Sequence, residues 1–201
     1  MSKKLKKIKI TVLLEGQTEK FYLEKFKNTY LSDEFVFEFI NLKTGNYNEF
    51  SKKLEEYKGM ENIVFVVVDL DKAENNQTEK ENLKKMCKNI TYINNKCNIF
   101  LTCKNFETFL SAHFKNCNDI CKLLKIDKKD IKNNENIYDT IIRNGGKYEN
   151  TLKNLSKENL CYHKIDSKNP TLDIDKIQFK QSGLILLQEY CQYLKSNWNK
   201  I

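Results

Sequence analysis

Six consecutive apolar residues, Ile63–Val68, constrain the fold of this chain more than any other feature. A strand with one solvated face alternates apolar and polar side chains, whereas a strand covered on both faces is apolar throughout. The run therefore predicts a central strand in a sheet that is covered on both of its faces. It ends in Asp69, so the same segment also places a carboxylate at the end of a buried strand.

Strands and helices are expected to alternate along the first half of the chain. Runs of β-forming residues predict four strands, at Ile8–Leu14, Phe35–Leu42, Ile63–Val68 and Cys97–Thr102. Apolar residues at helical spacing predict helices between them, from Glu19 to Tyr30, through Phe50 and Leu54, and through Leu83, Met86 and Ile90. Strands that alternate with helices form right-handed units and a largely parallel sheet.

The second half of the chain is expected to be helical. Helical patterns occur at Phe106–Phe114, Ile120–Leu124, Ile137–Arg143, Tyr148–Leu155 and Gln181–Trp198. The sequence therefore predicts an α/β fold. Residues 1–115 would form a parallel sheet flanked by helices, and residues 116–201 would form a helical C-terminal region packed on this core.

Composition bounds the class of protein without selecting a function. The formal net charge of +8 would suit a polyanionic partner, yet the lysines are interspersed with glutamates. Charge alone therefore supports nucleic-acid binding only weakly. No stretch approaches the roughly 20 apolar residues of a membrane span, and the basic N-terminus lacks a signal-peptide cleavage site. We therefore expect a cytoplasmic protein that is not attached to a membrane.

The seven cysteines are expected to be reduced thiols in a cytoplasmic protein. His113, Cys117 and Cys121 would share one face of a helix, and Cys161 and His163 could supply further zinc ligands. Their spacing matches no compact zinc-finger pattern. Zinc binding by these residues therefore stays an open alternative.

Carboxylates follow two of the predicted strands. Glu15 comes directly after the first strand, and Asp69 and Asp71 follow the buried strand. In parallel sheets, ligands bind beyond the carboxyl ends of the strands. Because Mg²⁺ and Mn²⁺ prefer oxygen ligands, the three carboxylates are candidate ligands for one or two ions. Glu15 is also a candidate general base.

The turn after the first strand has further features that suit a phosphate group. Gly16 would let the backbone approach a phosphate, and Thr18 is expected to cap the following helix. Glu19 would either ligate metal or complement the positive end of that helix. Each feature alone is also ordinary turn and capping chemistry, but their occurrence together with the Asp69–Asp71 pair is more specific.

Lys104 and His113 allow both functional and structural interpretations. Lys104 follows the fourth strand and could stabilise a phosphate or position the leaving oxygen. In so basic a chain, a solvated lysine is the simpler interpretation. His113 lies six residues after Glu107, which places the two on different faces of a helix. A structural role is therefore favoured for His113.

Three segments of the chain resemble RloB-like proteins, a branch of the Toprim superfamily. Residues 14–22, LEGQTEKFY, are similar to the EGxTEKxY opening of that family, and the VDLD of residues 68–71 matches the Toprim DxD position. Residues 102–114, TCKNFETFLSAHF, are similar to the SNPxFExWLLxHF segment, with Lys104 or Asn105 in place of Pro and Phe109 in place of Trp. The resemblance covers residues 8–115.

This resemblance implies a Toprim fold with a Mg²⁺- or Mn²⁺-dependent site at Glu15, Asp69 and Asp71. It makes Glu19 and Glu107 secondary acidic candidates. It also implies a nuclease that acts on DNA or RNA in prokaryotic anti-phage defence and abortive infection. The expected partners are nucleic acid and a protein of the defence system, and homo-oligomerisation is left open.

Two other functions fit the same fold. A non-catalytic sensor or effector module would bind nucleic acid or a partner protein, and its carboxylates would bind metal structurally or not at all. A receiver-like or nucleotide-binding domain would use the same carboxylates at the strand ends. The sequence has no GxGxxG or GK[ST] phosphate loop, which makes this last class the least favoured.

Overall fold

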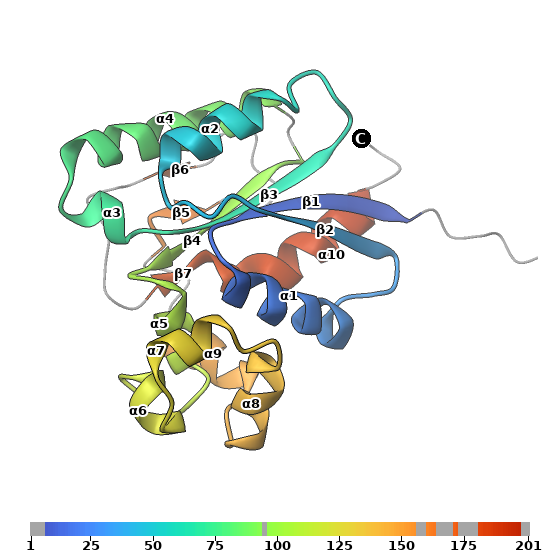
Figure 1. Ribbon diagram of the computed structural model, residues 1–201. Helices are drawn as coiled ribbons and strands as arrows, with labels where there is room; N and C mark the ends of the chain where they lie inside the picture. The colour runs from blue at the N-terminus through green and yellow to red at the C-terminus, as the bar shows by residue number, and fades with distance from the viewer. Residues whose placement is uncertain (1–6, 94–95, 156–159, 164–170, 173–180, 198–201) are drawn as a thin grey trace, which may run out of the picture.

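A five-stranded sheet with the order β2-β1-β3-β4-β7 lies between two layers of helices (Figure 1). The computed structural model describes residues 7–93, 96–155, 160–163, 171–172 and 181–197. Four strands are parallel: β1 (Ile8–Leu14), β2 (Phe35–Asn41), β3 (Ile63–Asp69) and β4 (Asn98–Cys103). The short β7 (Gln181–Ser182) runs antiparallel to β4. The predicted α/β fold with a largely parallel sheet is therefore confirmed.

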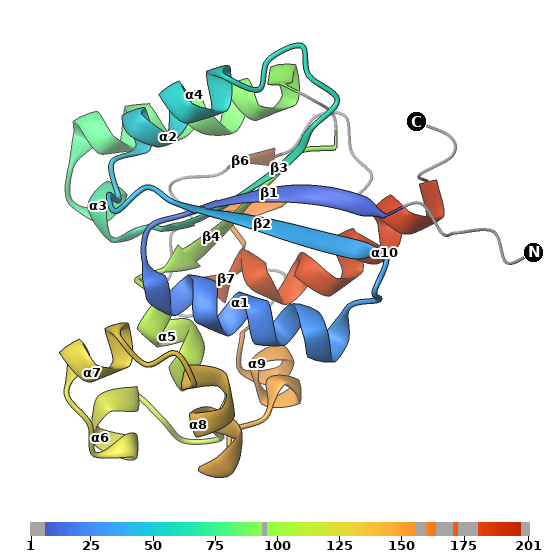
Figure 2. The same ribbon diagram turned by 45° about the vertical axis from the view of Figure 1, so that its right-hand side comes forward.

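The central strand β3 is buried on both faces. Phe65 and Val67 pack in one core with α1 (Gln17–Tyr30) and α10 (Leu187–Asn197). Val66 and Val68 pack in a second core with α2 (Tyr47–Glu55) and α4 (Gln77–Ile93). Because side chains alternate along a strand, the continuous apolar run supplies both cores. Figure 2 shows the same arrangement, with α1 and α10 on one face of the sheet and α2 and α4 on the other.

The short helices α5 to α9 form a separate group beside α1 (Figures 1 and 2). They are α5 (Phe106–Ser111), α6 (Ile120–Leu124), α7 (Lys128–Lys132), α8 (Ile137–Arg143) and α9 (Tyr148–Asn154). Aromatic rings join this group to α1: the ring centroids of Tyr22 and Tyr138 are 5.5 Å apart, and those of Phe26 and Tyr148 are 4.8 Å apart. The division of the chain at residue 115 stays a prediction.

The segment predicted as one long helix from Gln181 has three parts. It begins as strand β7, continues as a 3-10 helix (Gly183–Leu186) and then becomes α10. A Cβ atom at Gly183 would lie 3.1 Å from the backbone of Phe100 and Leu101, so the chain crosses β4 closely here. The expected helix was wrong over its first residues because Gln181 and Ser182 extend the sheet, and Trp198 lies outside the described residues.

The boundaries of two other helices also differ from those expected. The helix that starts at Phe106 ends at Ser111 rather than at Phe114. The first helix begins at Gln17, so its N-cap is Gly16, and the expected capping by Thr18 was wrong. The sequence pattern did not indicate the short helices α3 (Asp71–Glu74) and α7, nor the two-stranded sheet of β5 (Tyr162–His163) and β6 (Thr171–Leu172).

Candidate metal site at the strand ends

Glu15 and Asp69 meet at the carboxyl ends of neighbouring strands. Glu15 follows β1 directly, and Asp69 is the last residue of β3, which pairs with β1. The backbone N–H of Asp69 donates a hydrogen bond of 2.8 Å to Oε1 of Glu15. The parallel sheet therefore brings together two of the three predicted metal ligands.

Contacts from two further elements fix the position of Asp69. The Thr102 hydroxyl, on β4, donates a hydrogen bond to Oδ1 of Asp69. The Tyr47 hydroxyl, at the start of α2, donates a bond of 2.8 Å to the main-chain oxygen of Asp69. Thus β4 holds one carboxylate oxygen of Asp69, and α2 holds its backbone.

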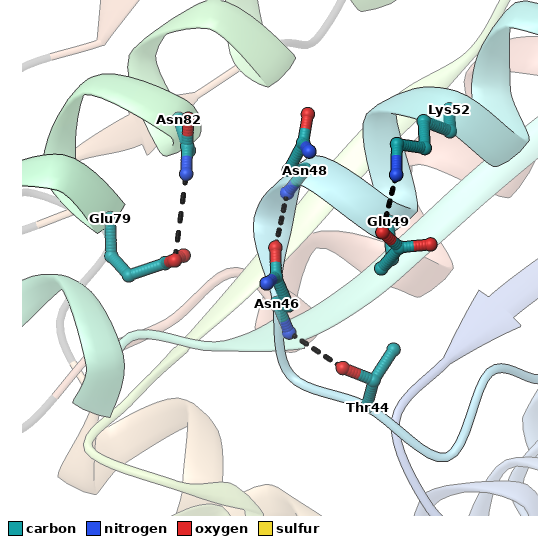
Figure 3. Close-up of polar contacts among 7 residues, drawn as sticks. All are labelled: Thr44, Asn46, Asn48, Glu49, Lys52, Glu79 and Asn82. Carbon is teal, nitrogen blue, oxygen red and sulfur yellow. Dashed lines mark hydrogen bonds and ion pairs between the residues drawn. The ribbon is translucent and has the colours of Figure 1, made fainter.

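The loop before α2 forms one wall of the site, and Gly45 is its point of closest approach. A Cβ atom at this position would lie 2.3 Å from Oε2 of Glu15, so a larger residue here would displace the carboxylate from its present position. The loop is held by local bonds, since the backbone N–H of Asn46 donates to the Thr44 hydroxyl and that of Asn48 donates to Oδ1 of Asn46 (Figure 3). These bonds order the wall that faces Glu15.

A cavity of about 260 Å³ opens at these strand ends. We call it the acid pocket, and its acidic lining residues are Glu15, Glu19, Asp69, Asp71 and Glu107. Lys43, Lys128 and Lys132 line it as well. The five carboxyl groups outnumber the three lysines, so the formal charge of the lining is negative.

Burial raises the pKa of Glu15 from its ordinary value of 4.5 to about 7. The hydrogen bond from Asp69 opposes this increase, and the negative charges of Glu19 and Asp71 add to it. The group is therefore charged only at an energetic cost, which a bound cation would relieve.

Burial also raises the pKa of Asp69 well above its usual range, and the charge of Glu15 adds to this effect. The hydrogen bond from Thr102 acts in the opposite direction. Glu19 is 7% exposed, and burial, together with the charge of Glu107, raises its pKa. Burial thus disfavours the charged form of three carboxyl groups in the pocket, and a nearby positive charge would stabilise that form.

Two lysines of α7 supply part of that charge. Lys128 and Lys132 are one helical turn apart, and both line the acid pocket. Lys128 Nζ lies 3.9 Å from Oε1 of Glu107, and Lys132 lowers the pKa of Glu19. These two residues could not be predicted, since a short helix of mainly charged residues carries no apolar pattern.

In the side-chain conformations of this structure, the carboxylates of the pocket do not surround one ion position. Asp71 is exposed, as the first residue of α3. Among the described residues, no group of three or more His, Cys, Asp or Glu side chains is arranged to hold a metal ion. The chemistry of the donor set nevertheless fits Mg²⁺ or Mn²⁺, because it offers only carboxylate oxygens and an excess of negative charge. Metal binding would require at least one of these side chains to change its rotamer.

His113 has the structural role that the sequence favoured. It is fully buried, its Nε2 accepts a hydrogen bond of 2.7 Å from the Tyr22 hydroxyl, and its Nδ1 lies 3.2 Å from the carbonyl oxygens of Phe109 and Leu110. Burial lowers its pKa to about 4, so the ring is neutral at physiological pH. The expectation that His113 shares one helical face with Cys117 and Cys121 was wrong, because α5 ends at Ser111 and only Cys121 lies in the next helix, α6. The His163 side chain lies outside the described residues.

Lys104 lies apart from the acid pocket. It lines a neighbouring hollow together with Thr108 and Ser111 of α5, whereas Asn105 and Glu107 line the acid pocket. Lys104 therefore lines a different cavity from the carboxylates that it was expected to assist.

Thr102, Tyr47 and Gly45 are site residues that the sequence alone did not reveal. Thr102 stands opposite Asp69 in the register of β3 and β4. Aligning the two expected strands by their ends would have placed Thr102 opposite Val68, within one residue of this pairing. Tyr47 offered no comparable signal, because its contact with Asp69 depends on how α2 packs on the sheet.

Comparison with known proteins identifies a family. A family model described as RloB-like protein matches residues 10–178. No curated protein and no solved structure matches the chain. Within the part of the chain that the structure describes, every helix is too short or too polar to cross a membrane.

Proposed function

Because the chain belongs to the RloB-like protein family, we propose that it is a divalent-metal-dependent nuclease of the Toprim type. It would cleave phosphodiester bonds of DNA or RNA in prokaryotic anti-phage defence, in the cytoplasm and together with a partner protein or as a homo-oligomer. The observation that carries the proposal is the contact between Glu15 and Asp69 in a pocket where burial raises the pKa of both carboxyl groups.

The proposal assigns roles to the residues of the acid pocket. Glu15, Asp69 and Asp71 would hold Mg²⁺ or Mn²⁺, which in such sites neutralises charge on the phosphate and activates water. If Glu15 did not ligate the ion, it would instead accept a proton as a general base, since its pKa of about 7 in the ion-free protein suits that role. Glu19 and Glu107 would support the site from α1 and α5.

Lysines near the carboxylates would contact phosphate groups of the nucleic acid. Lys128 and Lys132 line the same pocket and carry the positive charge that a phosphate group would contact. Lys104 is a candidate for the adjoining phosphates, since it lines the hollow on the other side of α5.

A cleavage assay with a matched control tests this function. Wild type, Glu15→Gln and Glu49→Gln are incubated with Mg²⁺ or Mn²⁺ and plasmid, single-stranded DNA or tRNA. Glu49 is the control, because it is an exposed glutamate of α2 that pairs with Lys52. Glu15→Gln should cleave about a thousandfold more slowly than wild type, because the transition state loses several kcal/mol of charge stabilisation. Glu49→Gln should cleave at the rate of wild type. Equal cleavage by wild type and Glu15→Gln would contradict the proposal.

A second function, a non-catalytic module that binds nucleic acid or a partner protein, is favoured by one observation. Oε1 of Glu15 and Oδ1 of Asp69 already accept hydrogen bonds from the protein, and no described trio of side chains is arranged around an ion. Calorimetric titration with Mn²⁺ separates the two functions. Absence of Mn²⁺ binding to the wild type would favour the non-catalytic module.

A further inference from the structure

Helix α5 borders two hollows of different character. Phe106 and Glu107 line the acid pocket, whereas Thr108 and Ser111 line a hollow of about 500 Å³ that also contains Lys104 and Lys115. We call this second cavity the α5 hollow.

A third cavity continues from the α5 hollow. It has a volume of about 950 Å³ and is lined by Lys115, Lys147, Lys153, Glu149, Asn150 and Gly145. We call it the α9 hollow. Because Lys115 lines both cavities, the two hollows adjoin and form one continuous surface from α5 to α9.

The lysines of this surface differ from those on the opposite side of the sheet. Lys115, Lys147 and Lys153 are exposed, and within the described part of the chain none of them forms an ion pair. On and after α2 and on α4, by contrast, lysines pair with glutamates three residues away: Lys52 with Glu49, Lys58 with Glu55, and Lys84 with Glu81. Figure 3 shows the first of these pairs.

The remaining side chains of the two hollows can also bind an anion. The described lining of the α5 hollow contains no Asp or Glu, and the α9 hollow contains a single acidic residue, Glu149. Hydroxyl and amide groups, from Thr108, Ser111 and Asn116 among others, line the α5 hollow. Such groups donate hydrogen bonds to phosphate oxygens without reading base sequence.

Hydrogen bonds fix the backbone of this surface. Nδ2 of Asn154 donates to the carbonyl oxygens of Ala112 and Phe114, at 2.8 and 2.9 Å. The carbonyl oxygen of His113 accepts bonds from Nδ2 of Asn150 and from the backbone N–H of Lys147, at 2.8 and 2.9 Å. These bonds join α9 to the chain that leaves α5, so the two lysine-bearing segments are held next to each other.

We propose that the α5 and α9 hollows bind the phosphodiester backbone of a nucleic acid, adjoining the acid pocket across α5. This inference rests on the proposed function in one respect, since it assigns the bound polymer as the substrate of the acid pocket. Lysines on flexible stems contact phosphates as point charges and tolerate any base sequence. DNA and RNA share this backbone chemistry, and the experiment distinguishes them.

The test measures binding separately from cleavage. Fluorescence anisotropy in EDTA follows binding of fluorescein-labelled single-stranded DNA, RNA and duplex DNA of equal length. The test variant is Lys115→Gln/Lys147→Gln/Lys153→Gln, and the control is Lys52→Gln/Lys58→Gln/Lys84→Gln. Both remove three positive charges, so their difference reports the location of the charge rather than its amount. Circular dichroism and thermal melting verify that both fold.

The hollow variant should bind the preferred nucleic acid at least about tenfold more weakly than the control. The slope of log affinity against log salt should fall by about 2 to 3, as expected for three lost phosphate contacts. In the cleavage assay, KM should rise and kcat should stay unchanged. Equal weakening by both variants, or no binding of any of the three probes by wild type, would overturn the inference.

The outcomes also separate this inference from the proposed nuclease function. Binding that depends on Lys115, Lys147 and Lys153 without any cleavage would support the binding surface and contradict the nuclease. Cleavage that depends on Glu15 but is unchanged in the hollow variant, with equal binding by both triple variants, would support the nuclease and contradict the binding surface.

Discussion

The acid pocket and the two basic hollows handle charge in opposite ways. In the acid pocket, Glu15 and Asp69 are partly buried and accept hydrogen bonds from neighbouring elements. In the hollows, the side chains of Lys115, Lys147 and Lys153 are exposed, and hydrogen bonds fix the backbone that carries them. Fixed carboxylates suit a small ion whose ligand positions are narrowly defined, whereas mobile lysines suit a polymer that offers phosphates at many positions.

The difference has an energetic consequence. Grouping carboxylates away from water raises their pKa values and makes the ion-free pocket unfavourable at neutral pH. Exposed lysines carry no comparable burial cost. We therefore expect the acid pocket to affect folding stability strongly and the hollows to affect binding without much effect on folding.

The first prediction is that the ion-free protein loses stability as pH rises through the range where Glu15 titrates. The pKa of Glu15 is 4.5 ordinarily and about 7 in the folded chain, so between these values the folded state binds the extra proton. The stabilisation is complete below about pH 4.5 and is lost as the pH rises through 7. The loss should be no more than about 3 kcal/mol.

Urea unfolding of wild type and Glu15→Gln in EDTA, from pH 4.5 to 8, measures this loss. Taking the difference between the two proteins removes the opposite effect of His113, whose lowered pKa costs stability as pH falls below 6.5. Glu15→Gln should become the more stable of the two as the pH rises. The hollow triple variant should follow wild type throughout. If the difference in unfolding free energy between wild type and Glu15→Gln stayed constant with pH, burial would not raise the pKa of Glu15.

The layers of the fold and the strand ends of the acid pocket could be predicted from local sequence. The apolar run Ile63–Val68 defines the central strand, and a strand that ends in a carboxylate places it at the sheet edge. Glu15 and Asp69 therefore followed from the strands alone. Thr102 required the register of β3 and β4, and Tyr47 required the packing of α2, so neither could be read from a single segment.

The hollows could not be predicted, because their lysines are not distinctive along the chain. Lys115 and Lys153 belong to segments that are distant in sequence and are joined by side-chain bonds from Asn150 and Asn154. Such bonds leave no periodic pattern. The fold also separates the interspersed charges that argued against a basic face. Lysines pair with glutamates on α2 and α4, whereas Lys115, Lys147 and Lys153 form no ion pair within the described part of the chain.

A second prediction concerns the wall of the acid pocket. Gly45→Ala would place a Cβ atom 2.3 Å from Oε2 of Glu15, so the carboxylate must move. If the pocket binds Mn²⁺, the affinity measured by calorimetry should fall about tenfold, as for changes that misplace a ligand. Oligonucleotide binding in EDTA should stay unchanged.

Gly59→Ala is the control for this substitution. Gly59 has a φ of 77° with no atom within 4 Å of an added Cβ, so alanine there introduces backbone strain without a clash. It should cost about 1 kcal/mol of stability and leave Mn²⁺ binding unchanged. Equal Mn²⁺ affinity for Gly45→Ala and Gly59→Ala would show that the Glu15 carboxylate is not part of the metal site.

The smallest effect is expected at the joint between α5 and α9. Asn154→Ala removes both hydrogen bonds to the carbonyl oxygens of Ala112 and Phe114, and should cost about 1 kcal/mol of stability in urea unfolding. The control, Asn133→Ala, loses one exposed bond within α7 and should change stability less. Because the joint positions the lysines of both hollows, Asn154→Ala should weaken oligonucleotide binding slightly and leave Mn²⁺ binding unchanged. If Asn154→Ala instead weakened Mn²⁺ binding as much as oligonucleotide binding, the acid pocket and the hollows would be one coupled site rather than two separately built ones.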